Sequence, residues 1–88
     1  MTRLTKLYRK LLDGRSLKFS EFESLLVAFG YRRVRQKGSH IAYRHPGIGD
    51  TRVIQPRGKE AKPYQVRQFV DKVEQYALTL DNENGTPV

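Results

Sequence analysis

Apolar residues recur at helical spacing in two stretches near the start of the chain. In the first stretch they occupy positions i, i+3, i+4, i+7 and i+8: Leu4, Leu7, Tyr8, Leu11 and Leu12. This spacing predicts one buried helix face, with Thr2 as the cap and Gly14 as the end.

The second stretch carries its own start and stop signals. Ser20 and Glu23 have the spacing of a capping box, in which each side chain accepts the other residue's backbone N–H. The apolar face that follows consists of Phe22, Leu25, Leu26 and Phe29. Gly30 is placed to end this helix in the left-handed conformation.

Strand-like runs replace the helical spacing in the middle of the chain. Two runs, 31–37 and 39–45, flank Gly38, and a third run, 51–55, follows the turn-forming residues 46–50. Residues 56–62 are then interpreted as a basic loop. Pro63 suits the first turn of a last helix, whose apolar stripe is Val66, Phe69, Val70, Val73 and Ala77.

The predicted order is therefore one helix followed by α-β-β-β-α, an α+β fold in which helices back a three-stranded antiparallel sheet. We expect an N-terminal helical extension at 1–19, one domain at 20–78 and a flexible tail at 79–88. The residues expected to be most buried are Leu25, Phe29, Ile41, Tyr43, Phe69 and Val73.

Positive charge is concentrated in the middle of the chain. The sequence has 17 Lys and Arg against 9 Asp and Glu, a net charge of +8. Residues 1–29 carry a net +3, residues 30–67 a net +8 and residues 68–88 a net −3. Cations packed this densely repel one another unless a ligand compensates them, so the pattern predicts a polyanionic partner, and nucleic acid first of all.

Composition excludes several other classes of protein. The chain has no Cys, so it has no disulfide scaffold, thiolate zinc site or cysteine nucleophile. Its two His have no partner at metal-ligand spacing, and no glycine-rich phosphate motif is present, so we expect no metal and no cofactor. Without a long apolar run or a secretory signal, we expect no membrane association and a cytoplasmic location.

The two runs around Gly38 predict a hairpin with distinct faces. If Lys37 and Gly38 form a two-residue turn, Arg35 lies opposite His40. Residues that oppose each other share a face. The core face then holds Arg32, Val34, Ile41 and Tyr43, and the other face holds Arg33, Arg35, His40 and Arg44.

An exposed histidine among cations points to RNA cleavage. RNA supplies its own nucleophile, the 2′-hydroxyl, so cleavage needs a base to remove that proton and cations to hold the charge on phosphorus. His40 beside Arg35 provides both, whereas His45, next to Pro46 and on the opposite face, is interpreted as structural. The residues expected to contact RNA are Arg33, Arg35, Lys37, Ser39, Arg44, Lys59, Lys62 and Arg67.

The same residues resemble the HicA (YcfA-like) toxin family over about residues 20–77. The resemblance is carried by Gly30-Tyr31, by Arg35-Gln36-Lys37-Gly38-Ser39-His40, by Tyr43 and His45-Pro46, and by Lys59-Glu60-x-Lys62 before an amphipathic helix. It implies a fold like the double-stranded-RNA-binding domain and mRNA interferase activity in a type II toxin–antitoxin system. It also implies that His40 is the essential residue and that a HicB antitoxin binds the toxin and masks the site.

Three features depart from the family pattern. Residues 1–19 precede its usual start. The third strand exits through Gln55-Pro56-Arg57, where the family often carries His, and the last helix begins with Pro63-Tyr64-Gln65 in place of Gly-Thr-Leu.

Two other functions compete with the nuclease. One is a non-catalytic RNA-binding module of the same fold, in which Lys59, Lys62 and Arg67 contact phosphates and His40 has no role. The other is a pure interaction partner for an acidic protein. The fold alone does not separate them, because function depends on the site.

Overall fold

Three helices and a three-stranded sheet make up most of the chain that the computed structural model describes, residues 3–80. The helices are α1 (Arg3–Leu12), α2 (Phe19–Ala28) and α3 (Pro63–Tyr76). The strands β1 (Arg32–Lys37), β2 (His40–His45) and β3 (Asp50–Ile54) form an antiparallel sheet in the order β1-β2-β3. The predicted α+β order, one helix followed by α-β-β-β-α, is confirmed.

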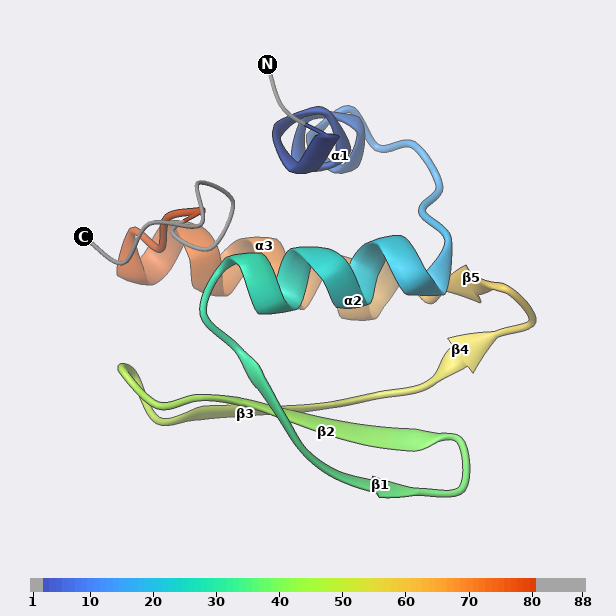
Figure 1. Cartoon of the computed structure of the whole chain (residues 1–88). Coiled ribbons are helices and arrows are strands. Elements are labelled where there is room, and N and C mark those ends of the chain that lie inside the picture. The colour runs from blue at the N-terminus through green and yellow to red at the C-terminus, as the bar shows by residue number, and fades with distance from the viewer. Residues whose placement is uncertain (1–2, 81–88) are drawn as a thin grey trace.

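The helices lie on one side of the sheet. Figure 1 shows α2 and α3 as a layer over the sheet, with α1 on the far side of that layer. In the part of the chain that the structure describes, no helix lies against the other side of the sheet. One sheet face is therefore packed and the other is free to meet a ligand.

The core lies between the α2–α3 layer and the sheet. Phe69 has no exposed surface, and its ring centroid lies 5.7 Å from that of Phe22, 5.4 Å from that of Phe29 and 6.1 Å from that of Tyr31. These rings meet close to edge-on, which adds to the free energy gained by burying them. The residues predicted to be most buried are all buried: Leu25, Phe29, Ile41, Tyr43, Phe69 and Val73.

The predicted stripe of α3 is correct except at its last member. Val66 and Val70 pack against the core beside the buried Phe69 and Val73. Ala77 is exposed because it ends the helix in the left-handed conformation, with φ of 51°. Leu78 and Leu80 return to the core, and residues 81–88 of the expected tail lie outside the described residues.

The N-terminal helix extends the core. Leu7 and Leu11 are buried, and the ring of Tyr8 lies 4.9 Å from that of Phe29 in α2. Leu12, the last member of the predicted face, is exposed. The helix ends before Gly14, as predicted, and Gly14 has φ of +77°; the predicted cap Thr2 lies outside the described residues.

The start of α2 differs from the prediction. The helix begins at Phe19, and the backbone N–H of Lys18 donates to Oε1 of Glu21 at 2.9 Å. The capping box predicted at Ser20 and Glu23 is therefore wrong. Glu23 lies inside the helix, where its carboxylate accepts a hydrogen bond from a sheet residue instead.

The end of α2 follows the prediction. Gly30 has φ of +101°, a conformation that glycine adopts without steric cost. Its N–H donates to the carbonyl of Val27 at 3.0 Å, and the N–H of Tyr31 donates to the carbonyl of Leu26 at 2.9 Å. This pair of bonds is the Schellman motif, which satisfies the last carbonyls of the helix.

A second small hairpin replaces the predicted basic loop. Strand β4 (Pro56–Arg57) pairs with β5 (Glu60–Ala61). The N–H of Phe19 donates to the carbonyl of Lys59 at 2.8 Å, and the N–H of Ala61 donates to the carbonyl of Leu17 at 2.9 Å. These bonds join the segment before α2 to the segment before α3.

The β1–β2 hairpin turns one residue later than predicted. Lys37 pairs with His40, so the turn is Gly38-Ser39, and Gly38 with φ of +60° fits the first central position of a type II′ turn. The register then shifts at Val34, which bulges between the pairs Arg33–Tyr43 and Arg35–Ala42. The predicted pairs of Arg35 with His40, Val34 with Ile41 and Arg32 with Tyr43 are therefore wrong. Val34, expected in the core, is 54% exposed.

Candidate nucleic-acid interface around His40

His40 lies on the sheet face that no described helix covers. Ile41 and Tyr43 are buried toward the helices, and side chains alternate along a strand. His40, Ala42 and Arg44 therefore point to the opposite side. His40 and Arg44 are exposed there, as predicted, and Ala42 is small enough to be covered by its neighbours.

The strand pairs arrange that side in three rows, because paired residues share a face. The rows are Lys37 with His40, then Arg35 with Ala42 and Val53, then Arg32 with Arg44 and Thr51. We call these eight residues the open face: Arg32, Arg35, Lys37, His40, Ala42, Arg44, Thr51 and Val53. It carries four cations and no carboxylate.

Lys37, and not Arg35, stands opposite His40. The later turn moves Arg35 one row along the sheet, to the pair with Ala42. A cation therefore stays beside the imidazole, although the residue that provides it differs from the prediction.

A polar network adjoins the row of His40. Ile54 pairs with Ile41 in antiparallel strands, so the next residue, Gln55, lies across from His40 and extends its row. Its Nε2 donates to Oγ of Ser39 at 3.2 Å, and its Oε1 accepts from Nζ of Lys62 at 3.2 Å. Ser39 and Lys62, both predicted to contact RNA, are thus connected to the turn that presents His40.

Three predicted RNA contacts lie away from the open face. Arg33 pairs with Tyr43, so it lies on the helix side of the sheet, where it bonds to Gln36 and lines a shallow hollow with Glu23. Arg67 lines a groove between the end of α1, β5 and α3. Lys59 is exposed in the turn between β4 and β5. The structure does not bring these residues together with His40.

His45 has the contacts of a packing residue. Its ring meets that of Tyr31 edge-on at 5.2 Å, and its Nδ1 accepts the N–H of Gly47 at 3.1 Å. A Cβ on Gly30 would lie 2.7 Å from its Nε2, so this approach requires glycine. The contacts support the structural interpretation of His45.

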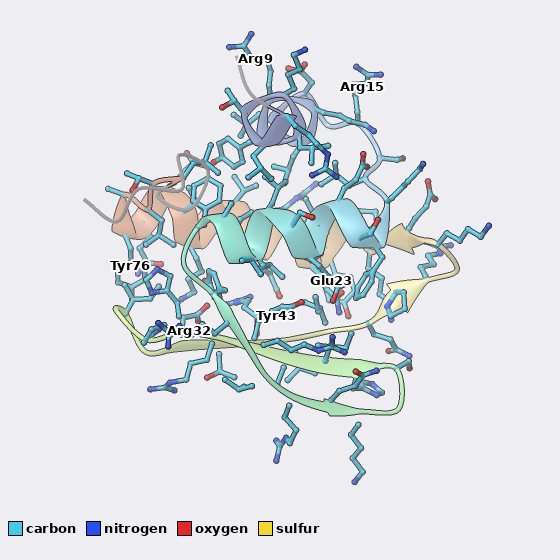
Figure 2. All side chains as sticks on the ribbon, in the orientation of Figure 1. Arg9, Arg15, Glu23, Arg32, Tyr43 and Tyr76 are labelled. Carbon is cyan, nitrogen blue, oxygen red and sulfur yellow. The ribbon has the colours of Figure 1, made fainter. Side chains whose placement is uncertain are left out.

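Two buried tyrosine hydroxyls tie the sheet to its neighbours. The hydroxyl of Tyr43 donates to Glu23 at 2.8 Å, and burial, helped by this hydrogen bond, raises the pKa of Tyr43 to about 12. Figure 2 shows Glu23 and Tyr43 between α2 and the sheet. The hydroxyl of Tyr31 donates to Asp50 at 2.8 Å, and burial raises the pKa of Tyr31 as well. Both hydroxyls therefore stay protonated at neutral pH and act as structural donors.

Asp50 anchors the other end of the sheet. Nε of Arg52 donates to its Oδ2 at 3.0 Å, and Nζ of Lys72 lies 3.9 Å from its Oδ1. Burial raises the pKa of Asp50, but the hydrogen bonds from Arg52 and Tyr31 and the charges of Arg52 and Lys72 outweigh it, so the pKa lies below its usual value. The carboxylate stays ionised and holds β3 against α3.

The open face joins a solvent-accessible imidazole to cations. An imidazole can take up a proton, and cations can stabilise an anion that develops beside it. Within residues 3–80, no group of three His, Asp or Glu side chains is placed to hold a metal ion. No helix in those residues is long and apolar enough to cross a membrane.

Comparison with known proteins decides the family. The family model for the HicA toxin of bacterial toxin–antitoxin systems matches residues 19–75. The chain belongs to the HicA toxin family. No curated protein and no solved structure matches it.

The HicA match confirms the resemblance seen in the sequence. It makes the chain a toxin of a toxin–antitoxin system, and the family implies a cognate antitoxin. Members of the HicA family are generally mRNA-cleaving toxins. The match begins at the first residue of α2 and ends within α3, so the whole sheet lies inside it and α1 lies outside.

Sequence reasoning missed two residues of the candidate interface. Arg32 belongs to the open face, but only the bulge at Val34 places it there, and the hydrophobic pattern contains no sign of that bulge. Gln55 was noticed as a departure from the family pattern. Its hydrogen bonds to Ser39 and Lys62 depend on how β3 meets α3, which local sequence does not show.

Proposed function

We propose that this HicA-family protein is a metal-independent endoribonuclease that cleaves mRNA with His40 as the general base. One observation supports this most strongly. His40 is an exposed imidazole on a sheet face that carries four cations and no carboxylate. A ribonuclease that uses the substrate's own 2′-hydroxyl needs a base and positive charge at one surface.

In the proposed reaction, a nitrogen of His40 takes the proton of the 2′-hydroxyl. The 2′-oxygen forms a bond to phosphorus, and the bond from phosphorus to the 5′-oxygen breaks. The leaving oxygen takes a proton from water, and His40 returns its proton to solvent. The products are a 2′,3′-cyclic phosphate, which water can open to a 3′-phosphate, and a 5′-hydroxyl.

The cations of the open face hold the RNA backbone and stabilise the charge on the reacting phosphate. Lys37 pairs with His40, which supports a role for its ammonium group at the reacting phosphate. Arg32, Arg35 and Arg44 lie further along the sheet and bind neighbouring phosphates. Such contacts give affinity that depends on salt and little on sequence.

A HicB-like antitoxin is the proposed protein partner. The open face has no covering element among the described residues, and its net positive charge suits an acidic surface. An antitoxin bound there would exclude mRNA and mask His40.

The test is His40→Ala. We expect the rate of RNA cleavage to fall by about 10²- to 10⁴-fold, the usual effect of losing a general base. Any growth arrest that the wild type causes should be lost with it. Stability should change by less than about 0.5 kcal/mol because His40 is exposed. RNA binding should persist because the cations remain. EDTA should leave wild-type activity unchanged, and the fragments should carry cyclic or 3′-phosphate ends.

The chain's other histidine provides the matched control. His45→Ala removes an imidazole that packs on Tyr31, so it should lower stability but keep activity at temperatures where the variant is folded. A folded His40→Ala protein that cuts at the wild-type rate would refute the catalytic assignment. A wild type that binds RNA without cutting it would instead favour the RNA-binding module.

A further inference from the structure

Gln55 makes hydrogen bonds from both its side chain and its backbone, to the β1–β2 turn and to the start of α3. Its backbone N–H donates to Oε1 of Gln65 at 3.2 Å, and Gln65 is a polar residue of α3 that is only 7% exposed. Its Nε2 donates to Ser39 in the β1–β2 turn, and its Oε1 accepts from Lys62, the residue that caps α3. The hairpin turn, the exit of β3 and the start of α3 therefore meet at one side chain.

The partners determine how the Gln55 amide is oriented. An ammonium group can only donate, so Lys62 requires the amide oxygen, and the NH₂ group is left to face the Ser39 hydroxyl. The position of the Lys62 charge is thereby linked to the turn that carries His40. A free lysine side chain has many rotamers in water, and this contact restricts them.

Lys62 keeps donors for a ligand. An ammonium group has three N–H donors, and Gln55 accepts one of them. Lys62 also precedes the first turn of α3, where the helix dipole adds positive potential. A phosphate near His40 and this helix start would therefore meet a positioned charge as well as the cations of the open face.

We infer that Gln55 is a positioning residue, which holds the Lys62 ammonium beside the Gly38-Ser39 turn, next to His40, so that it neutralises charge on the scissile phosphate. The inference rests on the proposed nuclease function and deepens it. Gln55 itself touches no reacting atom. It acts through Lys62 and Ser39.

The experiment compares steady-state RNA cleavage by Gln55→Met, Lys62→Met and the double variant. Methionine matches the length of glutamine, is one atom shorter than lysine, and removes the hydrogen bonds of both side chains. We expect each single variant to lower kcat by about 10- to 100-fold with a smaller change in KM, less than the loss from an enclosed oxyanion donor because the site is open. The double variant should be no slower than the slower single variant, because both changes remove the same positioned charge.

Gln68→Met is the matched control. Gln68 also joins α3 to the sheet, since its Oε1 accepts from Arg52 at 3.0 Å, and this bond lies outside the network of Ser39, Gln55 and Lys62. A role in stability alone would lower the thermal midpoint of both glutamine variants and leave kcat unchanged below it. We expect only Gln55→Met to lose kcat.

The outcomes separate this inference from the proposed function. If the wild type cleaves RNA and Gln55→Met has the same kcat, the inference is overturned and the proposed function stands. The same holds if the loss of kcat in the double variant equals the product of the two single losses. If Gln55→Met fails to fold, an unchanged kcat in Lys62→Met would overturn the inference in the same way. A wild type that leaves RNA uncut overturns the proposed function, and the inference with it.

Discussion

Asp50→Asn tests how the carboxylate at the end of the sheet stabilises the fold. The substitution keeps the shape of the side chain and an acceptor for the Tyr31 hydroxyl, but it removes the charge that faces Arg52 and Lys72. Hydrogen bonds to charged groups contribute about 1.5–3 kcal/mol each. The more distant Lys72 contributes little, because such pairs are worth about 0–1 kcal/mol. Arg52 keeps its hydrogen bond to Gln68, so its guanidinium is still partly satisfied. We therefore expect the free energy of unfolding to fall by about 1–3 kcal/mol at pH 7.

The stability contributed by Asp50 should decrease as the pH falls. The pKa of Asp50 is lower in the folded protein than the value of about 3.9 expected when it is unfolded. Its contribution is therefore fully present above about pH 4 and is lost as the pH falls through the folded-state pKa. Urea unfolding of the wild type and of Asp50→Asn between pH 7 and pH 2.5 should show that the difference in their free energies of unfolding decreases toward pH 2.5.

Asp71→Asn is the control for this experiment, because Asp71 is an exposed carboxylate on α3. It should change stability by less than about 0.5 kcal/mol at any pH. A gap for Asp50→Asn that stayed constant down to pH 2.5 would show that the loss comes from shape or packing, and would refute the electrostatic account.

Two further predictions concern the core and the RNA interface. Phe69→Ala should cost about 3–5 kcal/mol in urea unfolding, because it leaves a cavity among three aromatic rings; a loss below about 1 kcal/mol would contradict the packing. For RNA binding, the slope of log affinity against log salt should fall in magnitude by up to about 0.7 in Arg35→Ala, which removes an open-face cation. Arg33→Ala should change that slope less, since Arg33 lies on the helix side of the sheet. Equal changes would show that the bulge does not separate the two arginines.

The sequence predicted those parts of the fold that depend on local spacing. Apolar residues 3 and 4 apart identified the buried faces of all three helices, and Gly30 was correctly placed because only a left-handed residue can close the Schellman motif there. The start of α2 was misplaced because Leu17 and Phe19 are tied to the β4–β5 hairpin about 40 residues away. The carboxylate of Glu21 therefore accepts the backbone N–H of Lys18, and no local sequence pattern predicts this hydrogen bond.

The register of the β1–β2 hairpin shows which site predictions were robust. The later turn moves each pairing by two residues and leaves the faces unchanged. The bulge at Val34 shifts the strand by one residue, which moves side chains to the other face, and so it exchanged the faces of Arg32 and Arg33. His40 was unaffected because Ile41 and Tyr43 fix the faces of β2 by their own burial. The faces of the imidazole and of Arg35 were thus predictable, whereas those of Arg32 and Arg33, which lie beyond the bulge, were not.

The spacing of the rows suggests different roles for the cations near His40 and for those further along the sheet. Residues along a strand are about 3.3 Å apart, so the Cα atoms of Arg44 and His40 lie roughly 13 Å apart, which favours contact of Arg44 with a neighbouring phosphate. Arg44 and its row partner Arg32 can therefore hold the flanking backbone, and their loss should appear mainly in KM. Lys37 and Lys62 adjoin the row of His40, so in the proposed reaction they are the cations nearest to the developing charge. If RNA lies along β2, the open face binds it over its whole length but can cut it only at the Gly38-Ser39 end.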